Sequence, residues 1–220
     1  MNSNTKVALG FTGAVILVIL TFIVVAIVQA QSRPDPEPDP LTGLAQTFRE
    51  DSHRLSNPEN STVTFVEFLD FECEACGAAY PYVEELRSEY GDRVTFVMRY
   101  FPLPSHLNSQ NAAVAAEAAA RQGQLEEMYQ KLFESQVEWG EKQDSQAPLF
   151  REFAAEIGLD MAQYDSDVAD PTVLERVRSD FEDGVALGVA STPTMFVNDV
   201  LVKLTSFEDI RAAIEGALAE

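Results

Sequence analysis

Two apolar runs, TVTFVEFLDF at residues 62–71 and RVTFVMRYFPL at residues 93–103, are rich in β-branched and aromatic residues. Runs of this length and composition predict buried strands. The segment between them has apolar residues at helical spacing, and Gly91 then supplies a stop. The helical positions are Ala79, Val83, Leu86 and Tyr90. Strand, helix and strand form a βαβ unit, whose strands we expect to be parallel and whose crossover right-handed.

From Asn108 to about Gly188 apolar residues recur at three- and four-residue steps, which predicts a long series of helices. The pattern then returns to short strands, TMFV and VLVKL, joined at Asn198-Asp199 by a hairpin turn that tolerates positive φ. The final segment opens with Ser206 and Asp209 at capping-box spacing and continues as a helix. The order βαβ, helical insertion, ββα predicts an α/β protein.

The N-terminal part contains an uncharged run of 22 residues, from Val7 to Val28. As a helix it spans roughly 33 Å, enough for a hydrocarbon core of roughly 30 Å. The alternative is a signal peptide cleaved at Val28-Gln29-Ala30, but such peptides usually have an apolar region of only about 7–15 residues. We therefore favour an uncleaved transmembrane anchor. The sequence RPDPEPDP, residues 33–40, follows it as an extended, charged spacer.

The orientation of this anchor is decided by few charges. Lys6 on one side and Arg33 on the other give a tie under the positive-inside rule, and the free amine of the short tail favours a cytoplasmic N-terminus. The domain is then extracytoplasmic, on a single-pass protein of the cell membrane. The expected parts are a tail at 1–6, the anchor at 7–28, a Pro-rich acidic linker at 29–46, a first sheet half at 47–106, a helical insertion at 107–188 and a second sheet half at 189–220.

The net charge restricts the partners of the chain. It is −21 overall, and because residues 1–40 hold two cations against three carboxylates, the rest carries about −20. Without a basic face the domain is not expected to bind nucleic acid or anionic lipid, and the acidity is interpreted as a contribution to solubility. A hydrophobic fraction of 46% is enough for a core. The two cysteines are therefore not needed to hold the fold, and their role is expected to be chemical.

Cys73 and Cys76, the only cysteines of the chain, stand between the first strand and the helix that follows it. A thiol at a helix N-terminus meets unpaired N–H groups and the positive end of the helix dipole, and its pKa can fall to about 3.5–7.5. Residues three apart on a helix have Cβ atoms about 5–6 Å apart, so a rotamer change can close a disulfide. Cys73 is predicted to be the exposed nucleophile and Cys76 the more buried resolving thiol. No cofactor beyond this redox pair is expected.

Two further positions complete the predicted site. Glu67, in the middle of the first strand, is expected to have a raised pKa and to carry the proton of Cys76, although it could instead face solvent or pair with a cation. Thr192-Pro193 precedes the TMFV strand. A proline there can simply mark a strand edge. If its peptide bond is cis, the loop exposes unpaired backbone beside the cysteines, where an extended substrate could add as a strand.

Several of these features occur together in one known family. FLDFECEAC after an apolar strand with Glu67, then Pro81, the helical insertion and STPTMFVN resemble the DsbA-like thiol:disulfide oxidoreductases of the thioredoxin superfamily, over roughly residues 50–220. The resemblance implies a thioredoxin fold, with a central mixed sheet and an inserted helical domain. It also implies that Cys73 forms a mixed disulfide with substrates, that Cys76 resolves it, and that Pro193 is cis and shapes the groove. Glu74, Ala75 and Thr192 would border this site.

The two histidines are expected to have no catalytic role. His106, in the loop FPLPSHLN, is interpreted as a hydrogen-bonding or packing residue, and His53 likewise. A structural zinc site needs four nitrogen or sulfur ligands, and two cysteines with two scattered histidines match it poorly. No metal site is therefore expected.

Three functions fit the sequence. The first is a membrane-anchored oxidase that donates the Cys73–Cys76 disulfide to exported proteins with free thiols and is reset by a redox partner in the membrane. The second is a reductase or isomerase of extracytoplasmic disulfides. The third is a non-catalytic protein that binds exported clients and keeps the disulfide as a static bridge.

The dipeptide between the cysteines generates a first prediction. The strongest oxidants of the resembled family carry a histidine there, whereas this chain has Glu74 and Ala75. A carboxylate beside Cys73 opposes the thiolate by about 1 kcal/mol, which corresponds to about 20 mV in a two-electron couple. Glu74→His is therefore expected to raise the reduction potential, measured by equilibration with glutathione. An unchanged or lower potential would contradict the electrostatic argument.

Overall fold

The computed structural model of this 220-residue chain describes residues 46–220. The predicted tail at 1–6, the anchor at 7–28 and nearly all of the linker at 29–46 lie outside the described residues. Within residues 46–220 no helix is both long and apolar enough to cross a membrane. The anchor therefore stays a prediction from the sequence.

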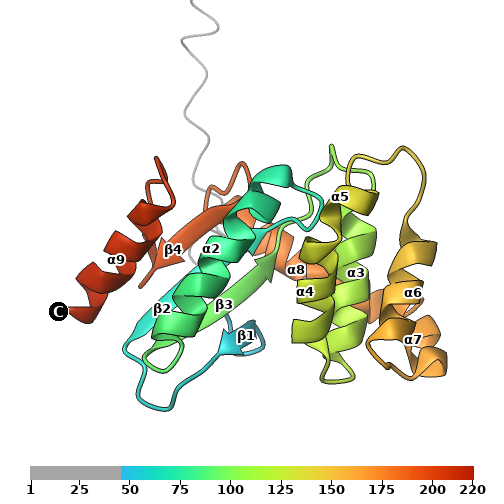
Figure 1. Cartoon of the computed structure of the whole chain (residues 1–220), viewed down its shortest axis with the longest axis horizontal. Coiled ribbons are helices and arrows are strands. Elements are labelled where there is room, and N and C mark those ends of the chain that lie inside the picture. The colour runs from blue at the N-terminus through green and yellow to red at the C-terminus, as the bar shows by residue number, and fades with distance from the viewer. Residues whose placement is uncertain (1–45) are drawn as a thin grey trace, which may run out of the picture. The chain divides into compact units, whose positions relative to one another are not determined.

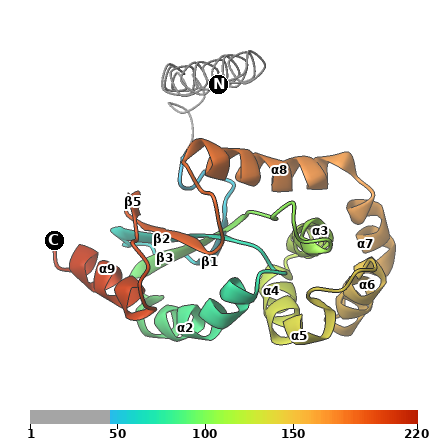
Figure 2. The ribbon, with the colours of Figure 1, turned by 90° about the horizontal axis from the view of Figure 1, so that it is seen from above.

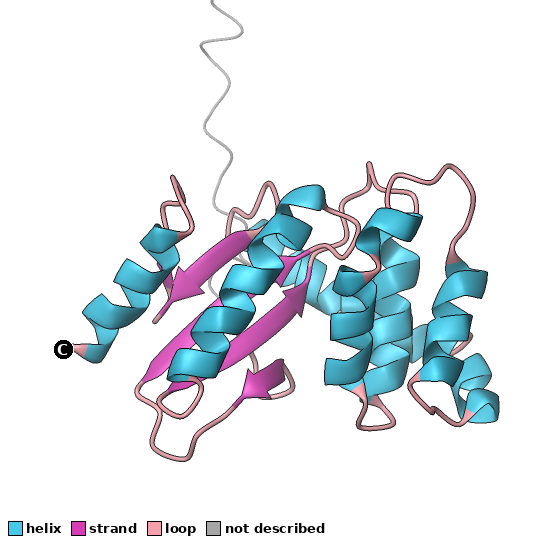
Figure 3. Cartoon of the chain, in the orientation of Figure 1, coloured by secondary structure: helices cyan, strands magenta, loops and turns pink. Residues whose placement is uncertain are grey.

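A mixed sheet with strand order β1-β3-β2-β4-β5 lies at the centre of the described residues (Figures 1 and 3). β2 and β3 run parallel, β4 runs antiparallel to β2 and β5 to β4, so the predicted βαβ and ββα units are confirmed. The strands are β1 (His53–Ser56), β2 (Val63–Leu69), β3 (Val94–Tyr100), β4 (Thr194–Val197) and β5 (Val200–Leu201).

The crossover helix α2 (Glu74–Tyr90) joins β2 to β3. Its buried face is the one that the sequence pattern predicts, at Ala79, Val83, Leu86 and Tyr90. The helix ends before Gly91 as expected, but Gly91 keeps a φ of −64° and is not a left-handed cap. α2 and α9 (Glu208–Leu218) cover one face of the sheet, and α8 (Pro171–Ala186) lies on the opposite side (Figure 2).

The chain between β3 and β4 is helical, as predicted. Its first helix is rich in alanine, and its small buried side chains let the neighbouring helices approach closely. Besides α8, its helices are α3 (Ser109–Ala120), α4 (Leu125–Glu134), α5 (Gln136–Trp139), α6 (Ala147–Glu156) and α7 (Met161–Val168). In Figure 3 these helices, without α8, form a group at one end of the sheet.

The C-terminal turns follow the sequence closely. Asn198 and Asp199 have φ angles of 47° and 65°, the left-handed values that a two-residue hairpin requires. The expected capping box is only half formed, because Asp209 accepts the N–H groups of Thr205 and Ser206 while no side chain caps the first turn of α9. The helix begins at Glu208, and Phe207 rather than the predicted Ser206 is at its N-cap position.

The edge strand β1 is an element that the pattern does not predict. Its four residues, HRLS, are half-buried and pair antiparallel with β3, with an irregular register between Arg54 and Ser56. Four residues without alternation are too short to carry a period-2 signal. Pairing with β3 therefore decides their conformation.

A buried ion network fastens α8 to the sheet. Arg99 of β3 is fully buried and donates to Asp180 and to Asp183 of α8, each at 2.6 Å. The same guanidinium donates to the carbonyl of Thr47 at 2.8 Å, and Arg49 makes two bonds of 2.6 Å to Asp183. This network holds the segment before β1 against the domain.

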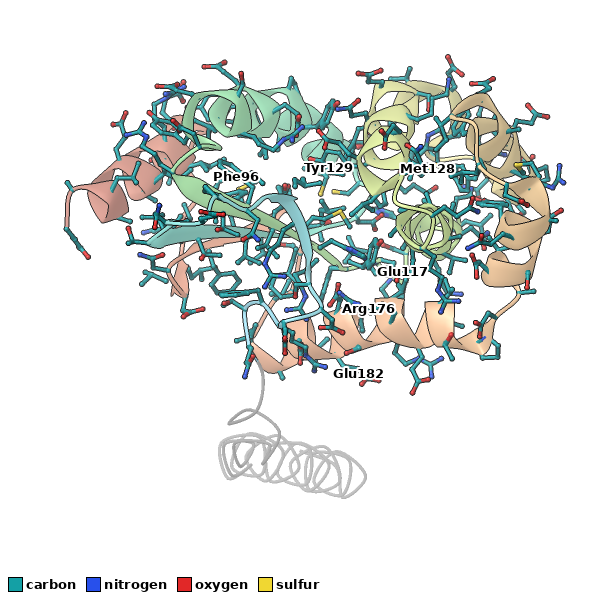
Figure 4. All side chains as sticks on the ribbon, turned by 90° about the horizontal axis from the view of Figure 1, so that it is seen from below. Phe96, Glu117, Met128, Tyr129, Arg176 and Glu182 are labelled. Carbon is teal, nitrogen blue, oxygen red and sulfur yellow. The ribbon has the colours of Figure 1, made fainter. Side chains whose placement is uncertain are left out.

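The two faces of the sheet have separate cores. Phe96 of β3 belongs to the cluster that α2 and α9 cover, as its position in Figure 4 shows. The cluster on the other face includes Phe68 and Phe101, which the half-buried Phe181 of α8 contacts. A third and larger cluster joins the sheet to the insertion, with Tyr129 of α4 among its members (Figure 4). Cys73 and Cys76 lie in this third cluster.

Candidate functional site

Cys73 stands at the N-terminus of α2, as the sequence predicts. Its backbone is extended, with φ −69° and ψ 120°, and α2 begins at Glu74. The Cys73 N–H donates to the Asp70 carbonyl at 3.1 Å, and the Cys73 carbonyl accepts from Gly77 N–H at 3.0 Å. The turn after β2 therefore places the Cys73 side chain beside the free N–H groups of the first helical turn.

Both thiols are free and largely buried. Cys76 has no exposed surface, and its Sγ accepts the Asp70 N–H at 3.5 Å. Cys73 is 9% exposed, and its thiol donates to the Thr192 carbonyl at 3.4 Å. Cys76 is the more buried of the two, as predicted, but the prediction that Cys73 is exposed is wrong. The loop before β4 covers it.

The environment shifts the pKa values of the two thiols in opposite directions. A hydrogen bond from the Cys76 thiol is the largest cause that lowers the pKa of Cys73, which falls to about 5 although burial opposes this shift. The N–H groups of Ala75 and Cys76 also lower it, as a helix N-terminus should. Burial raises the pKa of Cys76 well above the usual thiol value. One thiol is therefore ready to act as a nucleophile at neutral pH, and the other keeps its proton.

Thr192 and Pro193 meet the pair from the far end of the sequence. The Thr192-Pro193 peptide bond is cis, as the sequence reading suggested. The Thr192 hydroxyl is buried and has no hydrogen-bond partner among the described residues. A thiolate at Cys73 would offer this hydroxyl an acceptor, so the Thr192 side chain is a further cause that lowers the pKa of Cys73. Thr192 can thus accept from the Cys73 thiol through its carbonyl and donate to the thiolate through its hydroxyl.

Glu67 lies in the middle of β2, only 4% exposed. Alternation along the strand places it on the same face as Phe65, which packs in the cluster beneath α2. Burial, followed by the charges of Glu84 and Cys73, raises its pKa to about 8, and the Glu67 charge in turn raises the pKa of Cys76. The alternative of a solvent-facing glutamate is excluded, and no ion pair involves Glu67 among the described residues.

The two residues between the cysteines differ from the rest of the site because both are exposed. Glu74 is at the first position of α2, where solvent screens its carboxylate, and Ala75 contributes its backbone N–H. The neighbouring Glu72 has turned inward instead. It is 1% exposed, and its carboxylate accepts the N–H groups of Asn108 at 2.6 Å and Glu141 at 3.2 Å.

The sequence reading did not identify Gln136, which belongs to the insertion. Its amide donates to the carbonyls of Phe71 at 2.7 Å and Cys73 at 2.9 Å. A Cβ atom at Gly77 would lie 2.0 Å from the Gln136 Oε1 atom, so a side chain there would displace the Gln136 amide from its place beside the turn. Nothing local marks Gln136 as a site residue, since it lies 63 positions from Cys73 along the chain.

His106 is hydrogen-bonded, which agrees with the predicted role. Its Nδ1 lies 2.7 Å from Oδ2 of Asp70, a buried carboxylate that the sequence reading also overlooked. The position of Asp70 between the apolar strand and the first cysteine was the available signal. Among the described residues no group of three or more His, Cys, Asp or Glu side chains could hold a metal ion.

The comparisons with known proteins agree with this geometry. A family model described as Thioredoxin matches residues 52–216, and the chain belongs to that family. A thioredoxin-like oxidoreductase from Silicibacter pomeroyi DSS-3 is 27% identical, with a TM-score of 0.66 over 83% of this chain and 99% of that chain. The thiol-disulfide exchange protein alpha-DsbA2 from Wolbachia pipientis is 23% identical, with a TM-score of 0.66 over 79% of this chain and 90% of that chain, which shows a shared fold. The resemblance to DsbA-like thiol:disulfide oxidoreductases is thereby confirmed.

A curated relative adds a different context. The Na(+)/H(+) antiporter NhaA 1 of Mycobacterium sp. (strain KMS) is 39% identical over 168 residues, which are 74% of this chain and 26% of the antiporter. The chain thus spans about a quarter of the length of the curated relatives that it matches. The remaining three quarters of the antiporter have no counterpart in this match.

The pKa of Glu67 generates a prediction for stability. Because its folded value of about 8 exceeds the ordinary 4.5, the folded state binds more protons than the unfolded state between these values, and stability falls as the pH rises through this window. Glu67→Gln removes this loss. We expect the reduced variant to match the parent near pH 5 and to be about 3–5 kcal/mol more stable near pH 8.5, measured by urea unfolding.

The matched control for this prediction is Glu152→Gln, a change at an exposed glutamate of α6. This variant should show the same difference in unfolding free energy between pH 5 and pH 8.5 as the parent. If the stabilities of the parent and of Glu67→Gln changed with pH in the same way, the pKa of Glu67 would not be raised by folding and the prediction would be wrong.

Proposed function

We propose that this protein is an extracytoplasmic thiol:disulfide oxidoreductase that donates its Cys73–Cys76 disulfide to exported proteins. The observation that carries the proposal is the opposite shift of the two pKa values, to about 5 for Cys73 and upward for Cys76. A thiol with a pKa of about 5 lies about two units below pH 7, so at this pH its ionisation stabilises the reduced protein by ~2.7 kcal/mol. This is about 60 mV in a two-electron couple, in the direction of an oxidant.

The donation proceeds by two exchanges. A thiolate of the exported protein attacks Sγ of Cys73 in the disulfide, forms a mixed disulfide and releases Cys76. A second thiolate of the same client attacks the client sulfur of the mixed disulfide, so the client gains a disulfide and Cys73 leaves as a thiolate. The client loses two electrons, the cysteine pair gains them, and Cys73 is the better leaving group because its pKa is low.

Glu67 and the Thr192 loop have separate tasks in this scheme. Cys76 needs a proton when it is released, and Glu67, with a pKa of about 8, is protonated at neutral pH and can supply it. The client binds as an extended strand along the loop at Pro193. Backbone carbonyl and N–H groups of the residues in this loop can pair with it. Glu74 and Ala75 border the same entrance from the exposed first turn of α2.

The cellular setting is part of the proposal. The anchor at 7–28 holds the protein in the cell membrane with its N-terminus in the cytoplasm, and a membrane redox partner reoxidises the pair. The name of the antiporter relatives supports a membrane setting. The Cys73–Cys76 pair is the only redox group that the reaction needs, and neither nucleic acid nor a metal takes part.

The reduction potential of the purified chain tests the direction of transfer. Equilibration with glutathione is expected to give a value less negative than about −200 mV, because the thiolate stabilises the reduced form. A value below about −250 mV would favour the reductase, or the static bridge of a client-binding protein. Cys73→Ser is the control, since it cannot form the couple.

Trapping of the mixed disulfide tests the assignment of the two thiols. Cys76→Ser is incubated with a client that already holds a disulfide, so that the Cys73 thiolate attacks this bond, forms a mixed disulfide and releases one client thiolate. Without Cys76 to resolve it, the mixed disulfide should accumulate, visible on non-reducing gels and removed by reductant. Cys73→Ser should accumulate none, since Cys76 is fully buried. Equal trapping by the two variants would contradict the assignment, and trapping by neither would favour the static bridge.

A further inference from the structure

The backbone of Asp70 contacts both cysteines. Its N–H donates to Cys76 Sγ at 3.5 Å, and its carbonyl accepts the Cys73 N–H at 3.1 Å. Asp70 directly follows β2, so it connects the sheet to the thiol pair. Any group that fixes Asp70 therefore also fixes the position of the two sulfur atoms.

The side chain of Asp70 is tied on both oxygen atoms. Oδ1 accepts the Glu72 N–H at 2.8 Å, and Oδ2 accepts the Leu103 N–H at 2.8 Å and lies 2.7 Å from Nδ1 of His106. The carboxylate has no exposed surface, whereas the imidazole is 19% exposed. His106 is the one side chain among these partners, and the scheme of disulfide donation gives it no task.

The charges around His106 favour its cationic form. Burial lowers its pKa, but the hydrogen bond and charge of Asp70 outweigh this effect, and the negative charges of Cys73 and Glu72 add to it, so the pKa is raised. Arg178 of α8 lines the same cavity of about 420 Å³ as His106. Its positive charge disfavours a second cation there and so acts against the rise in the pKa of His106. The attraction between His106 and Cys73 is mutual, because a coulombic interaction stabilises both charges.

We propose that His106, held on the Asp70 carboxylate, is a positioning residue that stabilises the thiolate of Cys73 in the reduced protein. The proposal deepens the function given above and rests on it, since only a thiol pair that cycles between two states gains from this charge. The imidazolium is paired with Asp70 through Nδ1 in both states. In the reduced state its positive charge interacts with a thiolate at Cys73, whereas in the oxidised state the cysteines form a neutral disulfide.

The chain contains a matched control for this pair. The other histidine, His53 of β1, lies 2.6 Å from Glu117 of α3, and its side chain is 17% exposed. The two histidine–carboxylate pairs therefore agree closely in distance and burial. The difference is that neither His53 nor Glu117 is hydrogen-bonded to the turn that carries the cysteines.

The first experiment measures the thiolate absorbance of the reduced chain against pH for the parent, His106→Gln and His53→Gln. Removing the imidazolium should raise the pKa of Cys73 by at least about half a unit, because a nearby opposite charge favours the ionised thiol. His53→Gln should leave it at the parent value. An unchanged Cys73 in His106→Gln, or an equal shift in both variants, overturns the proposal.

This design separates the proposal from the proposed function. A parent thiol that titrates near the ordinary value contradicts the oxidase, whereas the difference between the parent and His106→Gln still reports on the histidine. A low parent value with no such difference contradicts only the role of His106.

The second experiment needs no variant in the measured protein. The imidazole pKa of His106 is followed by NMR in the reduced chain and after oxidation with glutathione disulfide, with His106→Gln used only to assign the signal. Oxidation removes the thiolate, so the pKa of His106 should fall. Equal His106 values in the two states overturn the proposal.

Discussion

The burial of the thiol pair under the helical insertion is the constraint on which the chemistry of the site depends. Cys73 and Cys76 belong to the core cluster that the insertion shares with the end of β2 and with β3. An apolar environment disfavours a thiolate, and at Cys76 the single N–H of Asp70 does not outweigh this cost. At Cys73 it is offset by the Cys76 thiol, Thr192 and the first N–H groups of α2. The same burial therefore produces two thiols with opposite properties.

The insertion also sets the geometry of the helix that carries the pair. Gln136 of α5 bonds to two carbonyls at the start of α2 and fills the space above Gly77. Glu72, between β2 and α2, accepts backbone N–H groups from the loop before α3 and from Glu141, two residues after α5. A site formed only by β2 and α2 would lack these restraints. The helical insertion therefore restrains the turn as well as covering it.

On the face of the sheet opposite α2, buried ion pairs hold α8 against β3. Arg99 and Asp180 are both fully buried, and their pairing is continued by Asp183, so each charge has several hydrogen-bond partners. Buried pairs of this kind add little net stability, but breaking one leaves an uncompensated charge. The network thus fixes α8 and the segment before β1 in one arrangement. Glu117 and Arg176, which lie close together in Figure 4, extend it towards α3.

Local periodicity in the sequence determined the order of elements, the buried face of α2, the hairpin at Asn198-Asp199 and the place of Cys73 at a helix N-terminus. These features depend on residues a few positions apart, whose spacing is visible in the chain. The strand β1 was not predicted because it is short and because its conformation depends on pairing with β3.

Only the tertiary structure decided which groups surround the thiols. Thr192 reaches Cys73 from 119 residues away, Gln136 from 63, and His106 reaches Asp70 from 36. Such contacts leave no periodic trace along the chain, since they arise when separate elements pack on the same sheet end. The sequence by itself identified a redox pair, and the packing of distant segments around it decided its exposure and its pKa values.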